Sequence, residues 1–141
     1  MAAGTQSEYK LPLPKMRGPA AEFYKFCQAH ELCFQRCADC AAWRHIPRDM
    51  CAKCGSFNFE WARSSGRGTV FSWTVAAQPF VPQFAPLVPY APAVIELEEG
   101  VRMVSWVTDI KPDELALGIP VEVAFDDVTP EVTLPKFRRR R

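Results

Sequence analysis

Apolar residues follow two different spacings along this chain, and the change between them divides it. Between residues 19 and 32 the side chains Phe23, Phe26 and Cys27 recur at three- and four-residue intervals, which is the spacing of one helix face. Pro19 suits the first turn of a helix, because proline lacks the amide hydrogen that would stay unpaired there. The pattern therefore predicts a helix over residues 19–32.

After residue 66 the pattern changes to short runs of β-branched and aromatic residues separated by turns. A strand is predicted over residues 69–77. Residues 93–98 and 102–109 face each other across Glu99-Gly100, which is typical of a β-hairpin. The remaining runs predict a short helix over residues 111–117, a strand over 121–125 and a last strand over 131–134. This order of strands and helix is that of an OB-type barrel.

Four of the six cysteines form two CxxC pairs between the predicted helix and the predicted strands. Cys37 and Cys40 are the first pair, Cys51 and Cys54 are the second, and ten residues separate the pairs. Each CxxC turn presents two thiolates to one ion, and zinc favours four such ligands in a tetrahedron. The sequence therefore predicts one structural Zn²⁺ ion, since four protein ligands leave no position for a reacting water.

Other uses of the cysteines and histidines stay open at this point. A redox CxxC or a pair of disulfides fits the same spacing, although two tandem pairs favour a metal. Cys27 and His30 lie three residues apart on the predicted helix. They could form a nucleophile and its base. The alternative is that both side chains pack in the interior, and the same is expected of Cys33. His45 lies between the two pairs and could replace one ligand.

The sequence shows no pattern typical of a membrane span or of a secretory signal, and this bears on the expected cellular compartment. No apolar run approaches the roughly 20 residues of a membrane span, and residues 1–17 lack the compact apolar stretch of a secretory signal. We therefore expect a cytoplasmic protein that does not associate with a membrane, in which reduced cysteines are available for metal.

Charge is distributed unevenly, although the net charge is only +1. Residues 71–135 carry ten acidic and two basic residues, a local charge of −8, whereas residues 136–141 add +5. OB-folds and zinc ribbons often bind nucleic acid, and Phe71, Trp73 and Trp106 could stack on bases. Affinity for a polyanion, however, comes mainly from basic residues that release counterions. The acidic barrel segment opposes binding to a polyanion. A nucleic-acid-binding protein is therefore kept only as the alternative hypothesis.

The acidic residues also bear on catalysis. They cluster at Glu96, Glu98 and Glu99 and again at Asp126 and Asp127, where they alternate with apolar residues or lie in turns. Such positions are typical of a solvated strand edge rather than of an acid–base pair in a pocket. We therefore predict no catalytic residue in this chain and no catalysis by the chain alone.

A stretch rich in proline and aromatic residues connects the first predicted strand to the hairpin. Residues 79–92 contain five prolines together with Phe80, Phe84 and Tyr90. Rigid aromatic side chains bind a partner with little loss of conformational entropy. If the loop is exposed, these three residues are expected to contact a partner; a loop folded over its own barrel end is the alternative.

The cysteine-rich segment and the barrel segment resemble a known family. The resemblance rests on LCFQRCADCAAWRHIPRDMCAKCGSFNFEWARSSGRGTVFSWTV, PYAPAVIELEEG and GIPVEVAFDDVTPEVTLPKFR. These stretches are similar to the rubredoxin-like zinc-ribbon plus OB-fold proteins that accompany thiolases and acyl-CoA enzymes. The likeness covers about residues 8–138, and the four cysteines match, although Ala41 stands where the first knuckle often has glycine.

The resemblance implies a function as well as a fold. Members of this family look like small subunits bound to a thiolase-fold partner, which supplies the catalytic cysteine or base. Such complexes cleave 3-oxoacyl-CoA by thiolysis or hydroxyacyl-CoA by a retro-aldol reaction, in aromatic or steroid side-chain degradation. Archaeal relatives look like a bridge between a thiolase and a hydroxymethylglutaryl-CoA synthase. A heterotetramer of two plus two subunits is expected, because thiolase-fold partners usually dimerise.

These observations give one expected organisation. The fold is mainly β, with an N-terminal helix, a rubredoxin-like zinc ribbon and a five-stranded OB-fold barrel. Arg138 and Arg139, together with Arg44 and Arg48, are candidates to meet coenzyme A phosphates or an acidic partner surface. The expected segments are an extended arm over residues 1–18, the helix over 19–32, the ribbon over 33–62, the barrel over 63–135 and a basic tail over 136–141.

Overall fold

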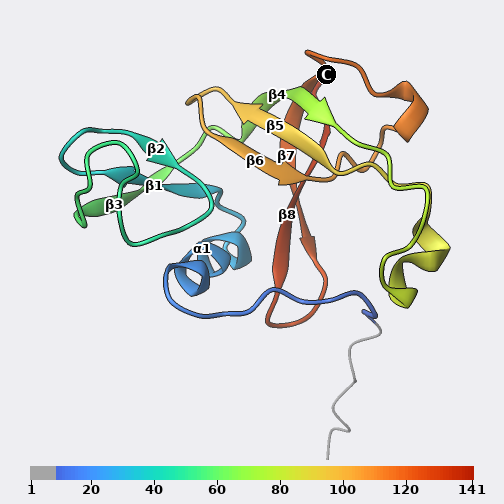
Figure 1. Ribbon diagram of the computed structural model, residues 1–141, viewed down its shortest axis with the longest axis horizontal. Coiled ribbons are helices and arrows are strands. Elements are labelled where there is room, and N and C mark those ends of the chain that lie inside the picture. The colour runs from blue at the N-terminus through green and yellow to red at the C-terminus, as the bar shows by residue number, and fades with distance from the viewer. Residues whose placement is uncertain (1–8) are drawn as a thin grey trace, which may run out of the picture.

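The computed structural model describes residues 9–141, which form a small three-stranded sheet and a larger five-stranded sheet joined by one helix. Figure 1 shows the helix α1, Pro19–Gln28, below and between the two sheets, where it contacts both β1 and β8. Within the described residues, no helix is long and apolar enough to cross a membrane.

The three-stranded sheet carries the cysteine pairs. Strand β1, Cys33–Cys37, lies in the middle and pairs antiparallel with β2, Trp43–Arg44, and with β3, Phe59–Arg63. The first CxxC turn follows β1 and the second lies in the loop between β2 and β3. The sheet therefore brings both turns to the same end.

The five-stranded sheet curls into a partly closed barrel. Its strand order is β6-β5-β4-β7-β8, with antiparallel neighbours throughout. A parallel bridge between Val107 and Phe137 joins the two edges, because the Phe137 amide donates to the Trp106 carbonyl at 2.8 Å. The strands are β4, Arg67–Trp73; β5, Ala93–Leu97; β6, Arg102–Ser105; β7, Pro120–Asp127; and β8, Thr133–Arg139. The predicted fold class is confirmed.

One continuous core connects the helix, the ribbon and the barrel. Phe23 and Cys27 of α1 and Phe34 of β1 pack in the same buried cluster as Ile95 and Phe137 of the barrel. Phe34, Ile95 and Phe137 are completely buried. Each aliphatic or aromatic side chain buried in this way stabilises the fold by about 1.5–3 kcal/mol, so the two sheets stabilise each other.

The helix ends four residues before the predicted boundary. The amide of Glu31 donates to the carbonyl of Phe26 at 2.9 Å, and the amide of His30 donates to that of Cys27 at 2.9 Å. This is the Schellman arrangement, which requires a left-handed residue after the helix. His30 fills that position with a φ of +57°. Glycine is the usual residue at this position, so the end of the helix could not be recognised from the residue type.

The last strand extends beyond the predicted barrel. β8 includes Lys136, Arg138 and Arg139, which the sequence analysis assigned to a tail, and it pairs with β7 along seven residue pairs from Thr133 to Arg139. Phe137 lies between charged neighbours and is completely buried. The alternation of inward and outward side chains is that of a barrel strand.

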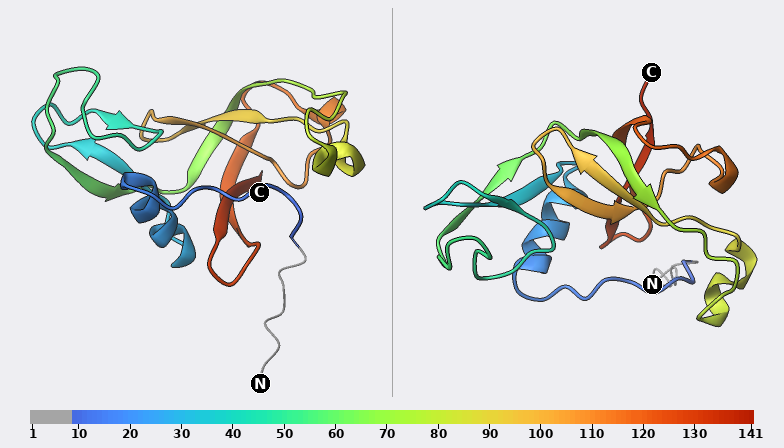
Figure 2. Two further views of the ribbon diagram at one scale, coloured as in Figure 1. Left: turned by 60° about the horizontal axis from the view of Figure 1, so that its bottom comes forward. Right: turned by 45° about the horizontal axis from the view of Figure 1, so that its top comes forward.

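Three other segments differ from, or fall outside, the predictions. The predicted helix at residues 111–117 is only a short 3₁₀ turn, η2, Pro112–Glu114. The proline-rich loop contains another, η1, Pro82–Leu87, at the end of the molecule away from the ribbon (Figures 1 and 2). Of the predicted arm, residues 1–8 lie outside the described residues, and residues 9–18 form no strand or helix before α1 begins at Pro19.

Candidate metal centre and partner-contact residues

The two cysteine turns have matching backbone hydrogen bonds. In the first, the amide of Ala41 donates to the carbonyl of Cys37 at 3.0 Å; in the second, the amide of Gly55 donates to that of Cys51 at 2.9 Å. Both closing residues are left-handed, with φ of +64° at Ala41 and +75° at Gly55. The chain therefore makes the same knuckle twice, once with glycine and once with alanine.

The four sulfurs meet in one cluster. The Sγ atoms of Cys37 and Cys54 are 3.6 Å apart, as are those of Cys40 and Cys51, and all four lie within 4.8 Å of one another. A tetrahedral ion with Zn–S bonds of about 2.3 Å separates its sulfurs by about 3.8 Å. The donor set and spacing fit a structural zinc of the Cys₄ type, and the segment is a zinc-ribbon domain.

Backbone amides favour thiolates in this cluster. The amides of Cys54 and Lys53 lower the pKa of Cys51 to about 6, and the amide of Cys40, 3.5 Å from the Cys37 sulfur, contributes most to lowering the pKa of Cys37. Such amide-to-sulfur contacts stabilise negative charge before any metal binds. Burial and the Cys51 sulfur, by contrast, raise the pKa of Cys40, and the Cys37 sulfur raises the pKa of Cys54 to about 12. The amides alone therefore favour two thiolates, and a bound ion would be needed to hold all four.

Side chains outside the cysteines hold the two knuckles together. Asp39, inside the first knuckle, accepts hydrogen bonds from the hydroxyl of Ser56 and, at 3.4 Å, from the side-chain amide of Asn58. Ser56 follows the second knuckle directly. The carboxylate of Asp39 thus connects the two turns independently of the sulfurs.

Arg44 stabilises the ribbon itself. Its Nε donates to Oε1 of the fully buried Gln35 at 3.1 Å, and its Nη2 donates to the carbonyl of Arg48 at 3.0 Å. The amide of Arg48 donates to the same Gln35 oxygen at 2.8 Å. Gln35 could not be recognised from the sequence, because a polar side chain gives no sign that it will be buried.

Cys27 and His30 do not form a nucleophile and base. Cys27 is completely buried, and burial raises the pKa of its thiol to about 12. His30 lies beyond the end of α1, and its Nε2 contacts Asp127 instead. Burial likewise contributes most to the raised pKa of Cys33. Thiols with raised pKa values are poor nucleophiles, so these two cysteines are packing residues.

The aromatic residues of the proline-rich loop divide into two groups. The rings of Phe84 and Tyr90 lie 5.4 Å apart, and Tyr90 lies 5.6 Å from Trp106, which follows β6. These residues pack the loop onto the barrel of the same chain. Phe80 is different: 89 % of its surface is exposed. Large aromatic residues exposed to this degree are typical of binding surfaces when they belong to an apolar patch.

The basic residues of β8 lie beside the acidic residues of the barrel. Arg138 Nε is 3.1 Å from a carboxylate oxygen of Glu122, and Lys136 Nζ is 2.6 Å from Asp126. The amide of Arg139 donates to Asp109 at 2.8 Å, and its side chain is exposed. The strand therefore compensates much of the negative charge of the preceding segment. Nothing in the described geometry brings Arg138 or Arg139 to Phe80.

The carboxylates that were weighed as catalytic groups all have partners within the chain. Glu96 pairs with Arg102 at 2.7 Å, and Glu99 accepts from the Ser65 amide at 2.7 Å. Glu98 lies 3.4 Å from Arg67. These contacts agree with surface positions at strand ends.

Two family models match successive parts of the chain. Residues 25–60 match the model described as ChsH2, rubredoxin-like zinc ribbon domain, and residues 61–126 match the model described as ChsH2, C-terminal OB-fold domain. The identity and order of the two domains agree with the resemblance noted in the sequence.

Individual relatives extend this result. A DUF35 domain-containing scaffold protein of Methanothermobacter thermautotrophicus is 33% identical over 110 residues, which are 63% of this chain and 82% of that protein. A probable enoyl-CoA hydratase alpha subunit of Thermomonospora curvata is 38% identical over 90% of this chain, but the match spans only 39% of that longer protein.

A solved structure has the same fold over almost its whole length. A chain of the Ltp2-ChsH2(DUF35) aldolase superposes with a TM-score of 0.79 at 37% sequence identity, covering 90% of this chain and 98% of that one. Together with the domain models and the scaffold relative, this likeness shows that the chain belongs to the DUF35 family of rubredoxin-like zinc-ribbon plus OB-fold proteins.

Proposed function

We propose that this chain is a zinc-binding, non-catalytic accessory subunit of a thiolase-type complex that cleaves carbon–carbon bonds of acyl-CoA thioesters. The observation that carries the proposal is the likeness to a chain of the Ltp2-ChsH2(DUF35) aldolase. The name of that assembly joins two components, and the alpha-subunit name of the hydratase relative also implies a complex. The hydratase name supports a CoA-linked function, and both names support a partner for this chain.

The chemistry of the described residues supports an accessory role. The acidic groups at 96–99 are paired with residues of the same chain, and the two cysteines outside the sulfur cluster, Cys27 and Cys33, are buried. A nucleophile or acid–base pair in the partner would therefore supply catalysis. The reaction is either thiolysis of a 3-oxoacyl-CoA, which uses one free coenzyme A for each bond cleaved, or retro-aldol cleavage, which uses none.

Zinc has a structural role in this proposal. Cys37, Cys40, Cys51 and Cys54 hold one ion, which fixes the ribbon against α1 and the barrel. The ribbon and helix then form a rigid surface for docking to the partner. Phe80 of the proline-rich loop, which Phe84 and Tyr90 hold on the barrel, borders the thioester channel in the assembled complex, and Arg138 and Arg139 contact the partner or coenzyme A at a separate place on β8. Two copies of this chain on a dimeric thiolase-fold partner give a heterotetramer in the cytoplasm.

Co-purification is the experiment that tests the proposal. The tagged chain is isolated from its source, the partner is identified by mass spectrometry, and zinc is measured for each copy of the chain. We expect a thiolase-fold protein and one zinc ion per copy. The reconstituted complex is then assayed with 3-oxoacyl-CoA and hydroxyacyl-CoA, with and without free coenzyme A, to distinguish the two reactions. Recovery of nucleic acid, or of the chain alone, would contradict the proposal.

A further inference from the structure

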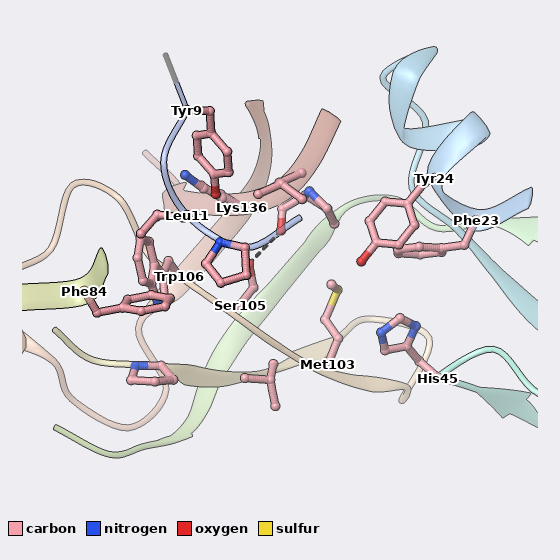
Figure 3. A pocket seen from close by; sticks show the side chains of 15 residues that line it. Tyr9, Leu11, Phe23, Tyr24, His45, Phe84, Met103, Ser105, Trp106 and Lys136 are labelled. Carbon is pink, nitrogen blue, oxygen red and sulfur yellow. Dashed lines mark hydrogen bonds between the residues drawn. The ribbon is translucent and has the colours of Figure 1, made fainter. Parts of the chain in front are cut away.

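A cavity of about 300 Å³ lies where the arm, α1, the ribbon and the barrel meet. Figure 3 shows its walls: Leu11 of the arm, Phe84 of the proline-rich loop and Trp106 lie on one side, Tyr24 of α1 lies on the other, and Met103 of β6 lies between them. These walls come from segments far apart in the sequence and are mostly apolar. The family models identify zinc-ribbon and OB-fold domains, not a ligand site.

The size of the cavity limits what it can hold. A cavity of about 150 Å³ lined by apolar side chains binds one benzene ring, so about 300 Å³ accommodates on the order of two fused rings. Aromatic walls favour flat ligands, because rings attract one another in stacked and edge-to-face arrangements. Phe23 and Tyr24, whose centroids are 5.1 Å apart at 80°, already form such a pair in the wall.

Two polar groups of the wall lack partners. The Tyr24 hydroxyl has no protein hydrogen-bond partner among residues 9–141, but Tyr24 is partly exposed and water reaches this oxygen; Figure 3 shows it directed toward the middle of the lining side chains. His45 also lines the cavity, and its Nδ1 is buried without a hydrogen bond in the described part of the chain. By contrast, the Ser105 hydroxyl donates to the Pro135 carbonyl at 2.6 Å.

The electrostatics favour an uncharged ligand. Burial lowers the pKa of His45 to about 4, so its imidazole is neutral near pH 7. The one charged side chain among the described lining residues, Lys136, is neutralised by Asp126 at 2.6 Å. A charged ligand would lose its hydration without gaining a free counter-charge, whereas a ligand with one hydroxyl or carbonyl group would satisfy Tyr24.

We propose that this cavity binds an uncharged bicyclic aromatic molecule, or a group of that kind, whose single polar atom hydrogen-bonds to the Tyr24 hydroxyl. The site is formed by this chain alone and does not depend on the thiolase-type complex. The isolated, zinc-loaded chain should therefore bind the ligand by itself. A failure to bind would contradict this proposal but not the proposed accessory function.

The test uses 2-naphthol as the probe and the full-length, zinc-loaded chain in isothermal titration calorimetry. For a ligand of this size we expect a Kd on the order of 0.1 mM. Tyr24→Phe removes only the unpaired hydroxyl, and one hydrogen bond is worth about a three- to tenfold change in affinity. Leu134→Trp, which fills the cavity from β8, is expected to abolish binding.

The control is Phe71→Ala on the outer face of the barrel, where Phe71 is exposed and lies under Arg102. This variant should bind 2-naphthol as the unchanged chain does. Far-ultraviolet circular dichroism and zinc content establish that each variant is folded. No binding up to about ten times the expected Kd, or equal binding by the unchanged chain, Tyr24→Phe and Leu134→Trp, would overturn the proposal.

Discussion

The imidazole Nε2 of His30 lies 3.0 Å and 3.1 Å from the two carboxylate oxygens of Asp127, although 97 residues separate them in the sequence. His30 is the left-handed residue that ends α1, and Asp127 ends β7. The His30 ring also stacks on Phe125 of the same strand, with 5.1 Å between ring centroids. The residue that stops the helix is therefore also the residue that attaches it to the barrel.

This contact predicts a defined acid dependence. Asp127 has a lowered pKa because the Thr133 hydroxyl, and then His30, hydrogen-bond to its carboxylate. A group with a lowered pKa in the folded state contributes stability above its unfolded pKa, which is near 3.8 here, and loses that contribution as the pH falls through the lower folded value. Asp127→Asn should therefore lower Tm at pH 6–7 and make less difference below about pH 4.

The measurement is a series of thermal melts of both proteins between about pH 3 and pH 7, with zinc content followed in parallel. Loss of metal in acid affects both proteins, so the difference in Tm between them isolates Asp127. A difference that stays constant or grows on acidification would mean that the carboxylate does not titrate as described.

Removing a zinc ligand should unfold the ribbon. Cys51→Ser is expected to lose bound zinc and, because structural zinc contributes directly to folding free energy, to expose the amides of β1–β3 to hydrogen exchange. Cys33→Ala is the matched control, since Cys33 is also buried at the ribbon but lies outside the sulfur cluster. Retention of one zinc ion by Cys51→Ser would show that the ligand set is different.

The two knuckles provide a reciprocal test of backbone strain. Ala41 and Gly55 occupy equivalent left-handed positions, where a side chain costs roughly 1–2 kcal/mol. A Cβ on Gly55 would meet no atom within 4 Å, so strain alone would act. Gly55→Ala should therefore lower the free energy of unfolding by about 1 kcal/mol, and Ala41→Gly should raise it by up to about 1 kcal/mol. Denaturant titration of the zinc-loaded proteins measures both; changes of the same sign would contradict the interpretation.

The proline-rich loop predicts a loss of binding without a loss of stability. Phe80→Ala should leave Tm unchanged, since 89 % of Phe80 is exposed, but should weaken co-purification with the partner. The combined replacement of Phe80, Phe84 and Tyr90 by alanine should weaken it further or raise KM for the acyl-CoA. Unchanged co-purification and unchanged KM in the triple variant would exclude the loop from the interface and the channel.

The sequence was most informative where function depends on local spacing. Two CxxC pairs and the residues after them were sufficient to predict one cluster of four sulfurs, because each knuckle forms from consecutive residues. Alternating apolar positions, with the family resemblance, were sufficient for the barrel. The end of α1 was missed because His30, rather than glycine, takes the left-handed position.

Long-range contacts could not be predicted in the same way. Nothing local to Gln35 indicates that Arg44 and Arg48 will surround it, and the cavity walls come together only in the folded chain. The basic run over residues 136–141 was interpreted by its charge, although the buried Phe137 within it offered a signal of strand alternation. In the structure this basic segment pairs with acidic β7, so the charge separation along the sequence largely cancels in space.

The shared core has a consequence for how this architecture is inherited. The boundary between the two family models falls between residues 60 and 61, inside β3, Phe59–Arg63. Phe23, Phe34 and Ile95 contribute to a single buried cluster on both sides of that boundary. A recombination event at this point would divide a strand and leave each half with an exposed apolar face. The ribbon and the barrel thus match two separate models but form one folding unit, and a substitution at their contact is expected to destabilise both.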